Sequence, residues 1–281
     1  STLFPYTTLF RSTNFSFHGR TLAAVAATGQ PHFHRGFEPM PEGFINAEFG
    51  DLQALEALIS PQTCAILCEP IQGESGVRPL SQEYLQGIRA LCDRHGLLLI
   101  FDEVQTGLGR TGTLFAHEQL GVTPDIMTLA KALGSGLPLS AMLTTEKIAA
   151  AFTPGTHAAT FGGNPVSCAA GVVVLRQLLA PGFLEAVRDT GAYFMAELQG
   201  LAGKFPQFAS GARGRGLLLG LTLTEKGIAH GAEIVNRMFE RGLIINFTGN
   251  QVLRFVPPLI VTRNDIDTLI RELEAVFAEL A

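Results

Sequence analysis

The strongest constraint on the fold is a set of short apolar runs, each followed by a charged or turn-forming residue. They lie in the first half of the chain, at residues 64–68, 97–101, 125–130 and 139–144. Residues 84–95, between the first two runs, have helical spacing of apolar side chains, and Gly96 ends that segment. Strands that are apolar along their whole length are typical of parallel sheets covered on both faces. The first half therefore predicts an α/β domain with a mostly parallel sheet.

The second half of the chain has a different pattern. Helical spacing covers residues 166–179, 183–201, 232–241 and 264–280, and strand patterns cover 216–223, 243–247 and 252–256. The last two strands flank a Thr-Gly-Asn turn and predict a hairpin. We expect an α+β domain here and place the boundary at residue 165. Residues 13–165 would then form a large, incomplete domain and residues 166–281 a small C-terminal one.

The first twelve residues differ from everything that follows. They read STLFPYTTLFRS and match the in-frame translation of a common sequencing adaptor. A short strand is the alternative, because Phe, Tyr and Thr favour strands. The segment also lacks the charged region and cleavage site of a signal peptide. We therefore expect residues 1–12 to be an artefact outside the fold, and the natural N-terminal part of the protein to be missing.

Composition excludes several classes of protein. With 47% hydrophobic and 16% charged residues, this chain of 281 residues can bury a substantial core and is not intrinsically disordered. No apolar run reaches the ~18 residues that a membrane-spanning helix needs. A net charge of −5 gives no basic surface for nucleic acid. The four cysteines lack zinc-type spacing, which favours free thiols in a reducing compartment and no metal site. We expect a cytoplasmic protein without nucleic-acid or membrane partners.

Two charged residues at the ends of apolar runs predict a shared pocket. Asp102 follows residues 97–101, and Lys131 follows residues 125–130. Because ligands bind at the carboxyl ends of parallel strands, the two side chains are expected to face one site. A partly desolvated lysine favours the neutral amine, which can bond an aldehyde, and an acid can keep a pyridine nitrogen protonated. Pyridoxal 5′-phosphate requires such a pair. The alternatives are a lysine that extends into solvent and an aspartate that caps the next turn.

A glycine-rich segment between these residues suggests a different cofactor. Gly107, Gly109 and Gly112 fit the dinucleotide-binding pattern G-x-G-x-x-G. Four residues separate the segment from the end of the predicted strand, whereas the dinucleotide fingerprint follows its strand directly. We therefore favour a flexible glycine turn over an NAD-dependent oxidoreductase.

Other polar residues are candidates for ligand contacts. Arg20 and Arg254 can each form a forked pair with a carboxylate, and Phe17 can stack on an aromatic ring. Each also has an ordinary explanation, a surface position for the arginines and core packing for Phe17. Residues 69–76 form a loop with two acids and two glycines. Thr160 precedes a helix and offers a hydroxyl to a phosphate, or simply belongs to a turn at the start of that helix.

Six ordered segments together resemble the class III aminotransferases, which have the type I fold of pyridoxal-phosphate enzymes. They are SFHGRT (16–21), EPIQGESG (69–76), LLIFDEVQTGLGRTG (98–112), PDIMTLAKALGSGLP (124–138), THAATFGGNPVSCAA (156–170) and VLRFVPPL (252–259). One such motif would be weak evidence, whereas six in order are specific. The resemblance covers the chain from about Asn14 to its C-terminus. It implies a type I fold, a homodimer with a shared active site, and further residues before the FHGR motif that this chain does not carry.

The resemblance implies a role toward pyridoxal 5′-phosphate for several residues. Lys131 would bond the cofactor and carry the proton between the substrate carbon and the cofactor. Asp102 would pair with the pyridine nitrogen, and Gln105 would hydrogen-bond the phenolic oxygen. Phe17 would stack on the ring. Thr160 would reach the phosphate of the neighbouring subunit's cofactor.

The resemblance also implies how substrates bind. Arg20 would hold the α-carboxylate of the amine donor, and Arg254 would bind the α-carboxylate of 2-oxoglutarate or glutamate. Glu74 would neutralise Arg254 while the donor is bound. The implied reaction transfers the distal amino group of N-acetylornithine, or a similar ω-amine, to 2-oxoglutarate in arginine biosynthesis, giving a semialdehyde and glutamate. Succinylornithine, ornithine, 4-aminobutyrate and lysine are alternative donors, and an inactive truncated fragment is the alternative for the polypeptide as written.

Overall fold

The computed structural model describes residues 9–281, which fall into two compact units. The first unit comprises residues 9–70, 80–108 and 115–178, and the second comprises residues 71–79, 109–114 and 179–281. The boundary expected at residue 165 therefore lies after Leu178 instead. The reason is that helix α5 (Pro165–Leu178) packs against the turn η3 (Lys131–Gly134) of the first unit. Segments 71–79 and 109–114 leave the first unit and join the second, which the sequence pattern did not predict.

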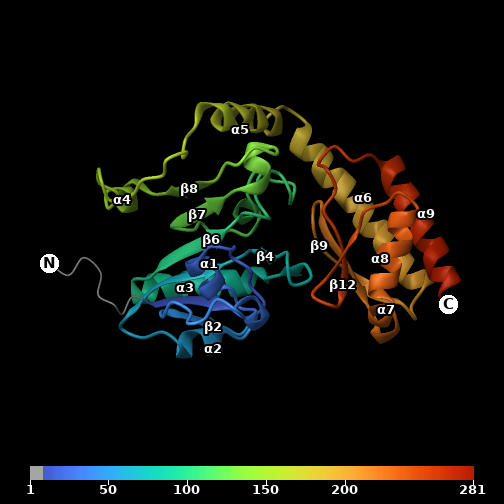
Figure 1. The fold of residues 1–281 in the computed structure, drawn as a ribbon, viewed down its shortest axis with the longest axis horizontal. Coiled ribbons are helices and arrows are strands. Elements are labelled where there is room, and N and C mark those ends of the chain that lie inside the picture. Colours follow the sequence, from blue (N-terminus) through green and yellow to red (C-terminus); the bar gives the residue numbers. More distant parts are fainter. Residues whose placement is uncertain (1–8) are drawn as a thin grey trace. The chain divides into compact units, whose positions relative to one another are not determined.

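The first unit is built on a six-stranded sheet (Figure 1). Its strands lie in the order β2 (Phe44–Ala47), β1 (Leu9–Thr13), β3 (Thr63–Cys68), β6 (Leu98–Asp102), β7 (Ile126–Leu129) and β8 (Ala141–Thr144). All neighbouring strands run parallel except β7 and β8, which are antiparallel. The predicted α/β class with a mostly parallel sheet is confirmed.

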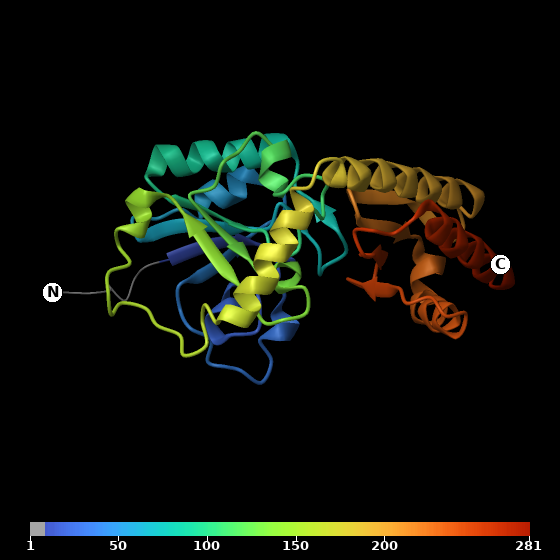
Figure 2. The same cartoon turned by 90° about the horizontal axis from the view of Figure 1, so that it is seen from above.

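Helix α3 (Gln82–His95) covers one face of this sheet (Figure 2). The Ser81 hydroxyl accepts a hydrogen bond from the backbone N–H of Tyr84 and caps the start of the helix, while Gly96 ends it with a φ of 67°. The apolar face of α3 is buried against β3 and β6 in one core cluster. The other helices of this unit are α1 (Leu22–Ala27), η1 (Pro31–Phe33), α2 (Leu52–Ala57), η2 (Ala116–Gln119), η3, α4 (Glu146–Ala149) and α5.

The N-terminal residues that were expected to lie outside the fold include most of strand β1. Residues 9–13 pair with β2 on one side and β3 on the other, and Arg11 is buried with its Nε–H donated to the carbonyl of Leu58 at 2.5 Å. The exclusion of residues 9–12 from the fold was therefore wrong. Phe10 and Thr13 are strand-forming residues, and the segment lies between β2 and β3 in the sheet. Residues 1–8 lie outside the described residues, and the origin of the segment stays a prediction.

The second unit is an α+β arrangement, as predicted. Its antiparallel sheet has the order β11 (Asn246–Thr248), β12 (Val252–Phe255), β10 (Leu218–Leu223) and β9 (Ala209–Arg215). Helices α6 (Phe183–Lys204), α8 (Gly231–Glu240) and α9 (Arg263–Glu279) supply most of the remaining core, and α7 (Glu225–Ala229) precedes α8. Strands β4 (Ile71–Gln72) and β5 (Arg78–Pro79) form a separate two-stranded ribbon.

Among residues 9–281, no single helix is long and apolar enough to cross a membrane. Helices α5 and α6 reach the necessary length and apolar content only when taken together, as two separate helices. One face of α6 is buried in the core of the second unit, through Val187, Phe194 and Leu198.

Candidate active site

A pocket of the first unit brings together residues from four segments of the sequence. It is lined by Phe17, His18, Gly19, Glu69, Asp102, Val104, Gln105 and Lys131. Asp102 is the last residue of β6, Glu69 follows β3, and Lys131 begins the turn after β7. Because these strands are parallel, their carboxyl ends meet at one edge of the sheet. The expected gathering of Lys131, Asp102, Gln105 and Phe17 is therefore present.

Asp102 is buried and held by several groups of the chain. Its Oδ2 lies 2.9 Å from Nδ1 of His18, and its Oδ1 accepts hydrogen bonds from the Val104 backbone N–H at 3.1 Å and the Thr128 hydroxyl at 3.4 Å. The His18 side chain is only 3% exposed, and its Nε2 lies 2.9 Å from the Ser12 hydroxyl. Sequence reasoning did not single out His18, although it stands in the FHGR segment directly after Phe17. Its contact with Asp102 spans 84 positions of the sequence.

Phe17 is fixed by its backbone as well as its ring. Its N–H donates a hydrogen bond to Oε1 of the buried Glu69 at 2.8 Å. Its ring meets the ring of Phe33 edge to face, with centroids 5.2 Å apart. Glu69 and Phe33 were also absent from the predicted site. Glu69 is the first residue after an apolar run, which is the signal that identified Asp102 and would have identified this acid.

Lys131 lies at the pocket, beyond the end of β7. It has a left-handed backbone conformation, with φ of 45°, and the residue is exposed. The partial desolvation expected of its amine stays a prediction. It also borders a second cavity of about 600 Å³, lined by residues 136–140 and 161–164 among others. Thr160 is exposed and is not among the residues that line either pocket.

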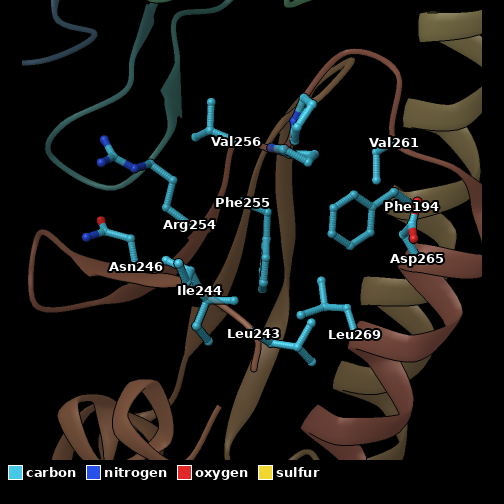
Figure 3. Close-up of a pocket in the computed structure, with 13 residues that line it drawn as sticks. Phe194, Leu243, Ile244, Asn246, Arg254, Phe255, Val256, Val261, Asp265 and Leu269 are labelled. Carbon is cyan, nitrogen blue, oxygen red and sulfur yellow. The ribbon is translucent and has the colours of Figure 1, made fainter. Parts of the chain in front are cut away.

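Arg254 and Glu74 form an ion pair within the second unit. Nη1 of Arg254 lies 3.3 Å from Oε2 of Glu74 and donates to the carbonyl oxygen of Gly73 at 2.8 Å. Among the described residues, its buried Nε has no hydrogen-bond partner. Arg254 borders a cavity of about 480 Å³ whose other walls are mainly apolar, among them Phe194 and Phe255 (Figure 3). The acid and the arginine expected to pair are therefore in contact.

The glycine-rich segment forms turns, as expected, and does not open a helix. Arg110 anchors it within the second unit by donating to the carbonyl oxygens of Leu217 at 3.1 Å and Pro257 at 2.6 Å. Burial lowers the pKa of Arg110 to about 10, so its guanidinium still carries its charge near neutral pH. Gly216 packs so closely on residues 110 and 111 that a side chain at this glycine would clash with their backbone. Within the segment, Gly109 and Gly112 have φ of 84° and 93°, and a side chain at Gly107 would crowd the Glu103 carbonyl oxygen, so the turn itself accounts for the three glycines without a dinucleotide.

The model of the family "Aminotransferase class-III" matches residues 8–277. The chain belongs to the class-III aminotransferase family. Among curated members, the acetylornithine aminotransferase of Myxococcus xanthus is 51% identical over 90% of this chain and 62% of its own length. The succinylornithine transaminase of Yersinia enterocolitica is 47% identical over 89% of this chain and 60% of its own length. This chain thus spans a little under two thirds of the length of these two relatives.

The fold agrees with that of solved family structures. The ornithine aminotransferase of Toxoplasma gondii superposes with a TM-score of 0.91 at 34% identity, over 99% of this chain and 66% of that one. That structure is described as having partial occupancy of pyridoxal phosphate at its active site. The type I fold expected from the sequence is confirmed.

Proposed function

We propose that the protein transfers the distal amino group of N-acetylornithine, or a similar ω-amine, to 2-oxoglutarate with pyridoxal 5′-phosphate as cofactor. The observation that carries this proposal is the pocket that gathers Lys131, Asp102, Gln105 and Phe17 from separate segments. The names of its relatives support the choice of N-acetylornithine, and the succinylornithine enzyme makes that related amine the second candidate. The reaction would belong to arginine biosynthesis in the cytoplasm.

The chemistry of the pocket fits pyridoxal phosphate. A buried carboxylate, a lysine and an aromatic ring stand together, and the carboxylate is already oriented by His18 and Thr128. When bound, the cofactor supplies an aldehyde carbon that takes up an amine and a ring that withdraws electrons from the neighbouring carbon. Lys131 would hold that aldehyde, Gln105 would donate to the phenolic oxygen, and Phe17 would cover one face of the ring.

Each side chain then has a defined task in the transfer. The Asp102 carboxylate would accept a hydrogen bond from the pyridine nitrogen and so keep that nitrogen protonated. Lys131 would carry a proton from the substrate carbon to the cofactor. Arg20 holds the donor by its α-carboxylate, so that the distal amine reaches the site of reaction. Arg254 binds the α-carboxylate of 2-oxoglutarate or glutamate once Glu74 releases it.

We also propose that two copies of the chain form a homodimer. Thr160 would contact the cofactor phosphate of the partner. An exposed apolar face on α5 and the loop before it supports an interface of this kind, since Val166, Val173 and Phe161 are each more than half exposed.

The proposed function is tested by the visible absorption spectrum of the protein incubated with pyridoxal phosphate, beside the variant Lys131→Ala. The wild-type protein is expected to keep a bound chromophore through dialysis, and the variant to lose it. Borohydride reduction followed by peptide mass spectrometry should place the cofactor on Lys131. Lys147→Ala serves as the matched control and should behave as wild type.

Substrate choice needs a second measurement. N-acetylornithine, succinylornithine, ornithine, 4-aminobutyrate and lysine are compared as donors with 2-oxoglutarate as acceptor. A bound cofactor without turnover of any donor would contradict the proposed reaction. No bound cofactor in either protein would support an inactive fragment instead.

A further inference from the structure

The guanidinium of Arg20 rests on two aromatic rings of the first unit. Its central carbon lies 4.5 Å from the centroid of the Phe33 ring and 5.3 Å from that of the Phe17 ring. The two rings stand at 66° to one another. The ring of His32 lies 4.0 Å from that of Phe33 on the same short turn, η1. Since a cation is attracted to the face of an aromatic ring, these contacts hold the guanidinium in one position.

The turn that carries Phe33 is tied to the strand that precedes Arg20. The Phe15 N–H donates to the carbonyl of Gly29 at 2.8 Å, and the Gly29 N–H donates to the Ser16 hydroxyl at 2.9 Å. A side chain at Gly29 would meet the Thr13 carbonyl oxygen, so the two segments approach too closely for any other residue. Phe33 is therefore supported by backbone contacts that do not involve Arg20.

The two candidate carboxylate-binding arginines are in different states. Arg254 already donates to Glu74 and Gly73. Within residues 9–281, by contrast, no carboxylate pairs with Arg20, and the residue is exposed. The N–H groups of a guanidinium lie in its plane and point outward from its edge, and the Arg20 group meets the two rings through its central carbon at 4.5 and 5.3 Å. Arg20 thus combines a fixed orientation with donors that a carboxylate can take up in a forked pair.

We propose that Phe33 is a positioning residue that sets the affinity for the carboxylate of the amine donor by holding Arg20. This inference rests on the proposed function, in which Arg20 binds that carboxylate. A guanidinium held in advance loses less conformational freedom when the donor binds, so the ring increases affinity without touching the donor. The ring is expected to increase the affinity only for donors that carry a carboxylate. The affinity for 2-oxoglutarate, which is bound by Arg254, should not change.

Steady-state kinetics of Phe33→Leu test this selectivity. The KM for N-acetylornithine is expected to rise roughly two- to fivefold, as for loss of an exposed cation–π contact, with kcat unchanged. The KM for 2-oxoglutarate should stay the same. The KM for N-acetylputrescine, which has the same chain and distal amine but no carboxylate, should also stay the same. Phe33→Tyr keeps the ring and should restore the wild-type values, and Phe37→Leu, at an exposed phenylalanine nearby, is the matched control.

A measurement without turnover separates this inference from the proposed function. In protein with isotope-labelled arginine, the side-chain δ protons of Arg20 should show an upfield ring-current shift that Phe33→Leu reduces, since the Phe17 ring remains. N-acetylnorvaline, which has the donor's carboxylate but no distal amine, is then titrated in the presence of pyridoxal phosphate. Its Kd from the Arg20 signals should rise roughly two- to fivefold in Phe33→Leu.

The outcomes distinguish the two ideas. Unchanged Arg20 shifts, or an unchanged Kd for N-acetylnorvaline, would overturn the role of Phe33 even in an active enzyme. Equal KM increases for all three substrates would also overturn it, because they would indicate a general loss of structure. If no amine is converted, the proposed function fails, whereas a Phe33-dependent Kd for N-acetylnorvaline would still support the positioning of Arg20.

Discussion

At the scale of single residues, Asp102 shows how a charge is prepared for a ligand. His18, the Val104 backbone and the Thr128 hydroxyl all contact this buried carboxylate. A carboxylate taken from water loses its hydration, and hydrogen bonds to the ionised form compensate for that loss. The charge of Asp102 is thus fixed in place at the end of β6 by the protein itself.

Removing the imidazole should weaken cofactor binding. The variant His18→Leu leaves one oxygen of Asp102 without its donor, and a hydrogen bond to a charged group contributes about 1.5–3 kcal/mol. We expect the Kd for pyridoxal phosphate, measured by absorbance, to rise roughly ten- to hundredfold. The control His95→Leu, on the exposed side of α3, should leave the Kd unchanged. Wild-type affinity in His18→Leu would show that Asp102 needs no such partner.

Removing Glu74 should shift the balance between the two substrates. In Glu74→Ala the guanidinium of Arg254 keeps its bond to Gly73 but loses its counter-charge. Glutamate should then react more readily and the ω-amine donor less readily, each by roughly two- to fivefold, since a partly exposed ion pair contributes about 1 kcal/mol or less. Single-turnover rates of the two half-reactions measure the ratio. Glu83→Ala is the control and should keep the wild-type ratio. The same ratio in Glu74→Ala would contradict the proposal that Glu74 leaves Arg254 when 2-oxoglutarate or glutamate binds.

The sequence predicted those site residues that end apolar runs, and the family resemblance added the rest. Asp102 and Lys131 follow strands, so their meeting at one sheet edge could be inferred from pattern alone. His18 and Phe33 could not be inferred in this way, because their importance lies in contacts with residues that are distant in sequence or on another turn. The exposure of Lys131 was also not predictable, since it depends on how the chain turns after β7.

At the scale of elements, the loop between β6 and η2 depends on one buried acid. Oε2 of Glu103 accepts from the Thr106 hydroxyl at 2.8 Å and the Ala116 N–H at 2.9 Å. Its Oε1 accepts from the His117 N–H at 2.9 Å and lies 3.2 Å from Nδ1 of the same residue. Glu103 therefore joins the two ends of the loop that carries Gln105.

The variant Glu103→Gln should loosen this loop. Its amide N–H₂ replaces one acceptor oxygen and faces backbone N–H groups, so at least one buried donor loses its partner at a cost of about 1–3 kcal/mol. Urea unfolding should report a lower free energy of unfolding, and limited proteolysis should cut within residues 104–115. Glu118→Gln, at the exposed end of the same loop, is the control. Equal stability and equal protease resistance in the two variants would show that Glu103 does not hold the loop.

Whole elements were predicted where apolar spacing was regular, and missed where it was not. Helix α3 and strands β6 and β12 follow the predicted segments closely, whereas β11 begins three residues after the start of the predicted strand 243–247 and includes Thr248, which was expected in the turn. Strand β9 (Ala209–Arg215) was missed because its sequence, ASGARGR, lacks large apolar residues, and it gains its order from pairing with β10. Strand β1 was misjudged because the likeness of residues 1–12 to a sequencing adaptor outweighed their strand-forming composition.

At the scale of the whole molecule, helix α5 exposes apolar surface in a single chain. Its narrow inner face, with Ser167 and Gly171, packs on the first unit, while Val166 and Val173 are 68% and 63% exposed, and Phe161 in the preceding loop is 83% exposed. A second copy of the chain that covers this face would remove it from water.

Light scattering after gel filtration should report a dimer for the wild-type protein. The double variant Val166→Asp/Val173→Asp should be a monomer with an unchanged far-ultraviolet spectrum, because two buried carboxylates without partners oppose association. Phe239→Asp, at an exposed phenylalanine on α8, should remain dimeric. A monomeric wild type would contradict the homodimer, and a dimeric double variant would place the interface on another surface.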